Sequence, residues 1–303
     1  MAVPAYASPL EKTWHYTYLV LCTLIFLFLI APILIIIPLS FNAEPYFTFT
    51  QKMLSFDPEG YSLRWYDSLL TFGMQEPDRM RDASWWLDVW QNAQWVQVAK
   101  HSVIIGIFAT LLATFLGTLA ALGLSRPEMP WRRPIMAILI SPMIVPIIIT
   151  ATGLFFFYSK TGLANSYPGI ILAHATLGIP FVIITVTATL VGFDHSLSRA
   201  AASLGASPRT TFFRVIMPLI LPGMVSGGLF AFVTSFDEVV VVLFVADHSQ
   251  QTIPRQMWNG IREQISPAIL AVATILVFVS IALLTTVELL RRRSDRVRGV
   301  TGR

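Results

Sequence analysis

The sequence predicts an all-α membrane protein with six transmembrane helices. Only 13% of its 303 residues are charged, 55% are hydrophobic, and the mean hydropathy is +0.66. A soluble domain carries about 25% charged residues. Six apolar stretches each reach the ~20 residues that a helix needs to cross a hydrocarbon layer of ~30 Å. These stretches are residues 18–41, 102–124, 135–158, 168–193, 219–245 and 268–290.

Several functional classes are disfavoured by what the sequence lacks. Its single cysteine, Cys22, lies in the first apolar stretch, so no internal disulfide and no cysteine metal site is expected. The formal charge is +4, but the basic residues stand at the ends of apolar stretches, so nucleic acid is not an expected partner. No phosphate-binding G-x-x-x-x-G-K-[ST] loop occurs. We therefore expect a non-enzymatic chain without a cofactor of its own.

The first stretch is expected to be a retained helix. It is too long for the apolar region of a signal peptide, and no A-x-A cleavage site follows it. Prolines recur in the stretches, and in lipid they are tolerated because neighbouring helices and Ser or Thr side chains satisfy the freed carbonyls. The prolines are Pro32, Pro38, Pro142, Pro146, Pro180 and Pro222.

The distribution of basic residues predicts the orientation, because Lys and Arg are enriched in short cytoplasmic loops. With the N-terminus inside, thirteen of the 21 basic residues fall on inner segments. They are Lys12, Arg126, Arg132, Arg133, Arg199, Arg209, Arg214, Arg291, Arg292, Arg293, Arg296, Arg298 and Arg303. Residues 1–17 and the basic tail 291–303 are therefore expected in the cytoplasm.

The long 42–101 segment is expected outside and contains a tryptophan-rich helix. Five residues fall on one face at helical spacing, and Asp82 or Ser84 is a candidate cap. They are Trp85, Trp86, Val89, Trp90 and Ala93. Two interpretations stay open. The helix lies at headgroup depth in the membrane interface, or it forms a docking surface for an external partner.

The segment 194–218 joins the fourth and fifth stretches and is unusually long. It has roughly 25 residues, where helix connections commonly need 2–8. Residues 197–204 are rich in Ala and Leu and predict a helix, which Gly205 ends. Ser207 and Pro208 then start a second helix. We expect two short helices on the cytoplasmic surface that fit a partner's groove, the alternative being a connector that meets only lipid headgroups.

This segment resembles the signature of ATP-binding-cassette importer permeases: Glu-Ala-Ala, three residues, Gly, nine residues, then Ile-x-Leu-Pro. The matching residues are Arg199-Ala200-Ala201, Gly205 and Val215-Ile216-Met217-Pro218, at the same spacing. Arg199 departs from the family, which has glutamate there. By the resemblance, the ATPase-coupling residues are Arg199, Ala200, Ala201, Leu204, Gly205, Ala206, Ser207, Pro208 and Pro218.

The resemblance implies a type I importer permease fold, with a five-helix core over 102–290. It also implies a bacterial inner-membrane complex with a second, non-identical permease subunit and a periplasmic solute-binding protein. Two ATPase subunits would bind ATP and Mg²⁺ and supply the energy. The stretch SFDEVVVVLFV is similar to the spermidine/putrescine-type branch, which implies a small, cationic, polyamine-like solute.

Asp237 and Glu238 are the only acidic residues well inside an apolar stretch. Carboxylates at membrane depth usually face a partner or an aqueous path. Asp237 would lie about 27 Å beyond Leu219, near the external mouth, at ~1.5 Å per residue. Because neighbours on a helix point ~100° apart, we expect only one of the pair to face the path. The alternative is a hydrated, structural pair where the helix leaves the membrane.

Four polar residues are therefore candidates for the translocation path: Ser235, Asp237, Glu238 and His174. His174 is either a hydrogen-bonded structural residue or a proton relay. Gly223 and Gly227 form a small-xxx-small pair, which is typical of close helix packing.

Two rival functions differ in class from this permease. A secondary transporter driven by an ion gradient predicts inverted repeats and broken helices, and the sequence has no convincing repeat. A membrane-embedded enzyme requires a convergent catalytic cluster, which the sequence does not indicate.

Overall fold

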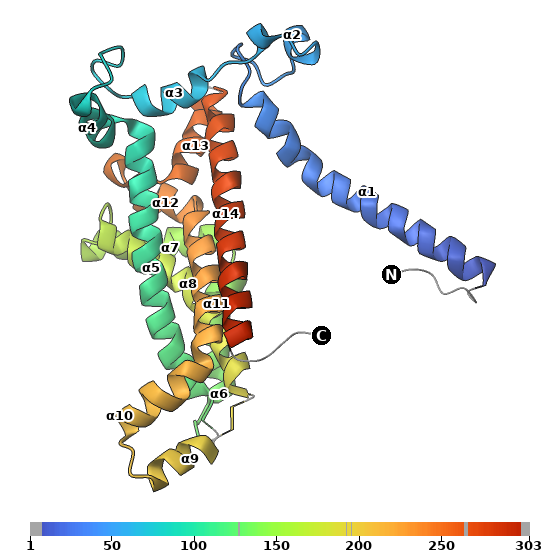
Figure 1. The fold of residues 1–303 in the computed structure, drawn as a ribbon. Helices are drawn as coiled ribbons and strands as arrows, with labels where there is room; N and C mark the ends of the chain where they lie inside the picture. Colours follow the sequence, from blue (N-terminus) through green and yellow to red (C-terminus); the bar gives the residue numbers. More distant parts are fainter. Residues whose placement is uncertain (1–7, 127, 192, 195, 264–265, 298–303) are drawn as a thin grey trace. The chain divides into compact units, whose positions relative to one another are not determined.

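The computed structural model describes residues 8–126, 128–191, 193–194, 196–263 and 266–297 (Figure 1). Within these ranges the chain is helical, apart from turns and one isolated bridge between Asn42 and Tyr61. It divides into a terminal unit, Met1–Val89 with Gly260–Arg303, and a central unit, Trp90–Asn259. The all-α prediction is confirmed.

The described part of the terminal unit includes two long helices and three shorter ones, besides most of the helix that starts at Ala83. They are α1 (Pro9–Leu39), α2 (Gln51–Leu54), the 3₁₀ helix η1 (Pro58–Gly60), α3 (Arg64–Thr71) and α14 (Ala268–Val297). Both α1 and α3 contact α14. Asn42 fixes the chain as it leaves α1, because its amide donates to the carbonyls of Tyr46 and Thr48, both at 3.0 Å. The backbone carbonyl of Asn42 accepts a hydrogen bond from Trp65 Nε1 at 2.7 Å, which ties this turn to α3.

Helix α4 (Ala83–Asn92) begins at the cap expected from the sequence. The Asp82 carboxylate accepts the Ser84 hydroxyl at 2.6 Å and the Trp85 N–H at 2.8 Å. These two hydrogen bonds hold the pKa of Asp82 below its ordinary value. An ionised carboxylate at this position also suits the positive end of the helix dipole.

The indoles of the 42–101 segment do not share one face. Trp85, Val89 and Ala93 are buried, whereas Trp86 and Trp90 are exposed. The spacing alone placed all five together, and that grouping is wrong. A residue one position further along the helix points ~100° away, which separates Trp85 from Trp86 and Val89 from Trp90.

Among the described residues, four helical segments are long and apolar enough to span a membrane. They are Pro9–Leu39, Gln94–Leu124 (α5), Tyr167–Val191 (α8) and Pro208–Phe236. Their prolines, such as Pro180 in α8 and Pro222 in the last segment, leave the helices continuous. The sixth predicted stretch lies in α14, whose described apolar part is Ala268–Ala282. Six crossings therefore stay a prediction.

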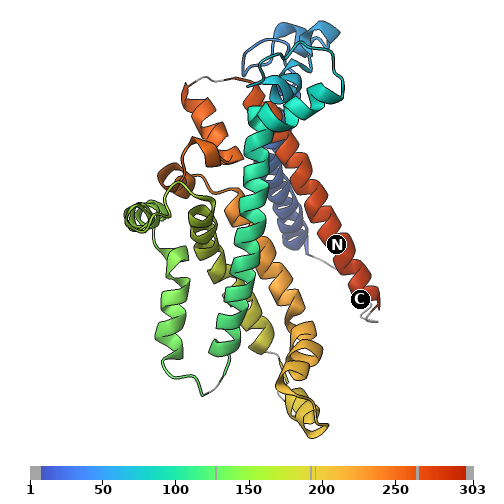
Figure 2. The same ribbon diagram turned by 90° about the vertical axis from the view of Figure 1, so that its left-hand side faces the viewer.

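The third predicted span is broken. Helix α6 (Arg132–Ile144) and helix α7 (Ile147–Thr161) meet at a bend of 100°, so one continuous helix over 135–158 is wrong. Figure 2 shows α6, in green, from the side and α7, in yellow-green, along its axis. Pro146 cannot donate a backbone hydrogen bond, and it forces Val145 into extended geometry with ψ 133°.

The fifth predicted span is also interrupted. Helix α11 (Met217–Phe236) ends at Asp237, whose N–H donates to the Val233 carbonyl at 3.0 Å. A separate short helix, α12 (Val240–Val245), follows. The expected continuous helix over 219–245 is therefore wrong, and the two acidic residues stand in the break.

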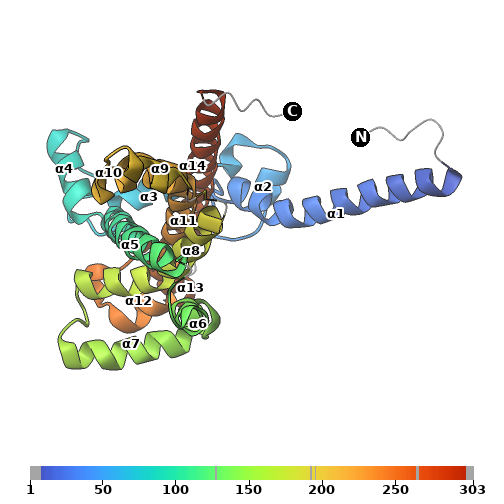
Figure 3. The same cartoon turned by 90° about the horizontal axis from the view of Figure 1, so that it is seen from below.

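Helices α5, α8 and α11 pack against one another in the central unit, as the view along them shows (Figure 3). Small residues bring their backbones close. A Cβ on Gly117 of α5 would lie 2.7 Å from Val182 Cβ, and one on Gly178 of α8 would lie 2.8 Å from Ala231 Cβ. Helix α12 packs on α7 and α8 through Val241, among other buried residues. In lipid, such close packing is what holds apolar helices together.

Replacing Gly227 with Ala should destabilise the central unit. The new Cβ would lie 2.7 Å from Val182 Cα, so the backbones of α8 and α11 must move apart. Overpacking of this kind costs about 1–3 kcal/mol. We expect a lower Tm for the detergent-purified protein.

The matched control is Gly153→Ala in α7, where an added Cβ meets nothing within 4 Å. This variant should keep or slightly raise the Tm, because Ala is favoured over Gly in a helix by about 0.5–1 kcal/mol. Equal Tm values for both variants would contradict the packing described here.

Candidate functional site

The 194–218 loop forms a sharp elbow at Gly205. Helix α9 (Ser196–Ser203) ends there, and Gly205 adopts a left-handed φ of +81°. The Ala206 N–H donates to the Ala201 carbonyl at 3.0 Å and the Gly205 N–H donates to the Ala202 carbonyl at 2.9 Å. This pair of bonds is the Schellman motif, which satisfies the last carbonyls of a helix and requires a left-handed residue.

The second arm of the elbow is continuous with a membrane helix. Ser207 caps α10 (Pro208–Thr211), with its hydroxyl accepting the Thr210 N–H at 3.3 Å. The chain then widens into the π-helix η2 (Phe212–Ile216) and passes into α11 without a break. Pro218 has no N–H to offer the carbonyl of residue 214, which accounts for the wider turn before it.

The elbow is exposed over most of its surface. No residue of α9 is buried, and Leu204 at the tip has 88% of its surface exposed. Arg199 and Ala200 are exposed, as are Ser207 and Pro208. A Cβ on Gly205 would meet no atom within 4 Å, so the space around the elbow is open.

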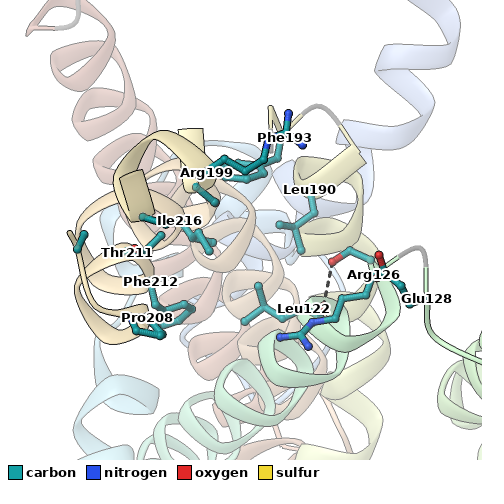
Figure 4. Close-up of a pocket in the computed structure, with 14 residues that line it drawn as sticks. Leu122, Arg126, Glu128, Leu190, Phe193, Arg199, Pro208, Thr211, Phe212 and Ile216 are labelled. Atoms are coloured by element: carbon teal, nitrogen blue, oxygen red, sulfur yellow. Dashed lines mark hydrogen bonds between the residues drawn. The ribbon is translucent and has the colours of Figure 1, made fainter. Parts of the chain in front are cut away.

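A hollow of about 800 Å³ lies between the elbow and the end of α5 (Figure 4). Its wall is mixed, with apolar residues such as Leu122 and Phe193 and with the basic residues Arg126 and Arg199. Glu128 is the one acidic side chain that lines it. Sequence reasoning missed Glu128, although it is the only acid in the 125–134 segment.

The two carboxylates in the break between α11 and α12 have different surroundings. Glu238 is only 7% exposed, and its Oε1 accepts the Val241 N–H at 2.9 Å, in the first turn of α12. Asp237 is exposed. One carboxylate is therefore engaged in starting a helix, and the other is exposed.

His174 of α8 and Ser235 of α11 form a buried pair beside this break. Their Nδ1 and Oγ atoms are 2.8 Å apart, and His174 is 1% exposed. Among the described residues, His174 Nε2 has no hydrogen-bond partner. The pair joins two helices at positions 61 residues apart, a relation that no local pattern in the sequence indicates.

Gly223 and Gly227 lie on the side of α11 that faces α8. A Cβ on Gly223 would lie 3.0 Å from the Thr185 carbonyl oxygen, and both glycines are buried. The same face of α11 continues to Ser235. The glycines and the histidine contact therefore hold α11 against α8 at both ends.

Residues after α12 are tied to the start of α5, which sequence reasoning also missed. The Ile253 N–H donates to Ser102 Oγ at 2.8 Å, and His101 Nδ1 lies 3.1 Å from the Gln251 carbonyl oxygen. Helix α13 (Ile253–Glu263) starts at this contact, after the 3₁₀ helix η3 (His248–Gln250). These two contacts tie the segment that follows α12 to α5.

Comparison with known proteins gives consistent matches. Residues 113–298 match the family described as binding-protein-dependent transport system inner membrane component. The chain is 31% identical over 271 residues to the spermidine/putrescine transport system permease protein PotC of Haemophilus influenzae, covering 89% of this chain and 95% of the relative. It is 29% identical over 265 residues to the putrescine transport system permease protein PotI of Escherichia coli, covering 85% and 84%.

A solved structure shares the fold. The crystal structure of a bacterial ABC transporter involved in the import of the acidic polysaccharide alginate contains a chain that superposes with a TM-score of 0.66. The superposition covers 96% of this chain and 99% of that chain, at 16% sequence identity. At this identity the likeness concerns the fold alone.

Ser235→Ala should lower the stability of the central unit. It leaves the buried His174 Nδ1 without its partner at 2.8 Å, while Nε2 already has none among the described residues. An unsatisfied buried polar group costs about 1–3 kcal/mol. We expect a lower Tm in detergent.

Ser226→Ala is the matched control, because Ser226 lies on the same helix and is exposed. It should leave the Tm close to that of the wild type. A Ser235→Ala variant as stable as the control would show that the histidine contact carries no stability.

Proposed function

The chain belongs to the family of binding-protein-dependent transport system inner membrane components, the permeases of ATP-binding-cassette importers, and we propose how it performs that role. It forms part of the translocation path for a small cationic solute and couples to a separate ATPase through the 194–218 loop. The observation that carries the coupling proposal is the exposed elbow at Gly205, whose second arm continues into a membrane helix.

Coupling requires that a movement at the loop reach the membrane. The segment Pro208–Phe236 is one helical rod of 29 residues that begins at the elbow and ends at Asp237. A force on the elbow would therefore act on the break that holds the exposed carboxylate. An ATPase can shift the permease between two states only if it contacts them differently, and a rigid elbow supplies such a contact.

A polyamine-like solute is favoured by the break at Asp237. The exposed carboxylate attracts cations, and acids at membrane depth commonly line a transport path. Glu238 is engaged with the start of α12, so Asp237 is the binding group and Glu238 the positioning group. The two relatives named above are spermidine/putrescine and putrescine permeases, which agrees with this solute class.

Broken helices are also typical of secondary transporters, and the chain has breaks at Pro146 and at Asp237. Family membership decides against that alternative, because the family's transport depends on binding proteins. The exposed elbow would also have no role in a transporter driven by an ion gradient.

The remaining partners follow from the family role. We propose a second, non-identical permease subunit, two ATPase subunits that bind ATP and Mg²⁺, and a periplasmic solute-binding protein. The elbow would face the cytoplasm of a bacterium, on the same side as both termini, because thirteen of the 21 basic residues then lie inside. The described part of α1 is exposed along almost all of its length, which suits a helix surrounded by lipid or a partner subunit.

Gly205→Val should uncouple the ATPase, whereas Gly205→Asn should not. A β-branched residue is strained at a φ of +81°, whereas Asn tolerates the left-handed region. The Cβ that both substitutions add meets no atom within 4 Å. We expect the tagged wild type and Gly205→Asn to retain a P-loop ATPase on purification in mild detergent, with ATPase activity, and Gly205→Val to lose both.

Failure of the wild type to retain any ATPase under several mild conditions would overturn the coupling proposal. Equal retention by all three proteins would show that the elbow geometry is not required for docking.

Asp237→Asn should reduce uptake of putrescine or spermidine more than Glu238→Gln does. The first change removes the exposed charge, whereas the second keeps an oxygen that accepts the Val241 N–H. We expect about a tenfold rise in KM for Asp237→Asn, equivalent to about 1.4 kcal/mol. Uptake of labelled polyamine by cells that express the whole transporter measures this difference, and an unchanged KM in Asp237→Asn would exclude the assigned role.

A further inference from the structure

After Asp194, the charged residues of the 194–218 loop are all arginines. Between Asp194 and Asp237 the sequence contains three arginines and no acidic residue. Arg199, Arg209 and Arg214 are all exposed. None of the three takes part in an ion pair within the described part of the chain. Their guanidinium groups can therefore form ion pairs with a partner of opposite charge.

Two of these arginines flank the tip of the elbow. Arg199 lies on α9 and Arg209 on α10, one on each side of Gly205. Leu204, at the tip, is almost fully exposed. Around it the side chains are small, with Ala202 and Ser203 both exposed. Along the chain, the exposed Leu204 therefore lies between two exposed arginines, and the small side chains next to it let a partner approach the backbone closely.

A protein fits this surface better than a membrane does. Helices that lie in the headgroup layer bury a face of Trp, Phe or Leu. Helix α9 has the sequence SLSRAAAS, with one leucine and no aromatic residue, and it buries no side chain. Arg214 lies further along the chain, in η2 beside the exposed Phe213, and is not part of this surface.

We propose that the ATPase surface receiving this loop carries Asp or Glu side chains that pair with Arg199 and Arg209, around an apolar notch for Leu204. The inference rests on the proposed function, since it names the chemistry of the partner at the coupling site. The signature that the loop resembles has an acid in place of Arg199, so the complementary charge on this partner is of the opposite sign. Arg forms bidentate hydrogen bonds with carboxylates, which adds directional specificity to the contact.

Replacing each arginine with lysine tests the pairing directly. All four lysines of the chain, Lys12, Lys52, Lys100 and Lys160, precede the loop, so R199K or R209K introduces the only lysine amine after residue 160. A water-soluble carbodiimide joins an amine to a carboxylate with which it is in contact. We expect mass spectrometry of the purified complex to identify a peptide that links position 199 or 209 to an Asp or Glu of the ATPase.

The matched control is R132K, at the start of α6, which is exposed and lies outside the loop. It should give no link to that carboxylate. If the ATPase is retained and neither loop variant links to it, the inference is overturned. Links from the loop to the serine carboxylate of phosphatidylserine alone would overturn it as well, in favour of a membrane contact.

Charge reversal supplies a second measurement. R199E and R209E should each retain roughly tenfold less ATPase than the wild type, the effect of about 1.4 kcal/mol, and R132E should retain it normally. Retention by the wild type should fall as salt rises from ~0.1 M to ~0.5 M, because salt screens exposed ion pairs. A wild type that binds no ATPase would disprove the proposed function. Equal retention by the wild type and both reversal variants would disprove only the acidic partner surface.

Discussion

The close approach of α8 and α11 is the contact on which the other features of the central unit depend. It exists because Gly223 and Gly227 have no side chains, so the backbone of α11 can lie against Thr185 and Val182. Apolar helices in lipid gain nothing from burying apolar surface, and close backbone packing replaces that driving force. The same contact places Ser235 beside His174, and it holds one end of the break where Asp237 is exposed.

Two departures from regular helix are each satisfied by local hydrogen bonds, one at the break before α12 and one at the exposed elbow. A backbone group in lipid must find a hydrogen-bond partner within the protein, so a helix can stop only where a side chain or another segment replaces the missing bond. At the start of α12, the Glu238 carboxylate accepts a backbone N–H in its first turn. At the Gly205 elbow, the Schellman bonds satisfy the last carbonyls of α9. One helical segment, Pro208–Phe236, joins these two sites.

Local rules predicted the loop well and the membrane breaks poorly. Gly205, Ser207 and Pro208 act on their immediate neighbours, so composition and spacing were enough to place both short helices and the turn between them. Pro146 and Pro180 look alike in sequence, yet the first stands at a 100° bend and the second lies in a continuous helix. The difference depends on tertiary packing, as does the pairing of His174 with Ser235. The predicted single face of Trp85, Trp86, Val89, Trp90 and Ala93 was wrong because residues adjacent in sequence were assigned to the same side of the helix.

The π-helix at Phe212–Ile216 affects how the loop is oriented relative to the membrane part of α11. A wider turn accommodates one residue more than an α-helical turn, and each residue advances the direction of the side chains by ~100°. This turn therefore sets the direction of Arg209, beside the elbow, relative to Gly223 and Gly227 on the packing face of α11. Removing one residue from this turn would take away one backbone N–H and one C=O and would shift the elbow relative to the packing face of α11. This single wide turn therefore determines how the elbow is rotated relative to the membrane part of α11.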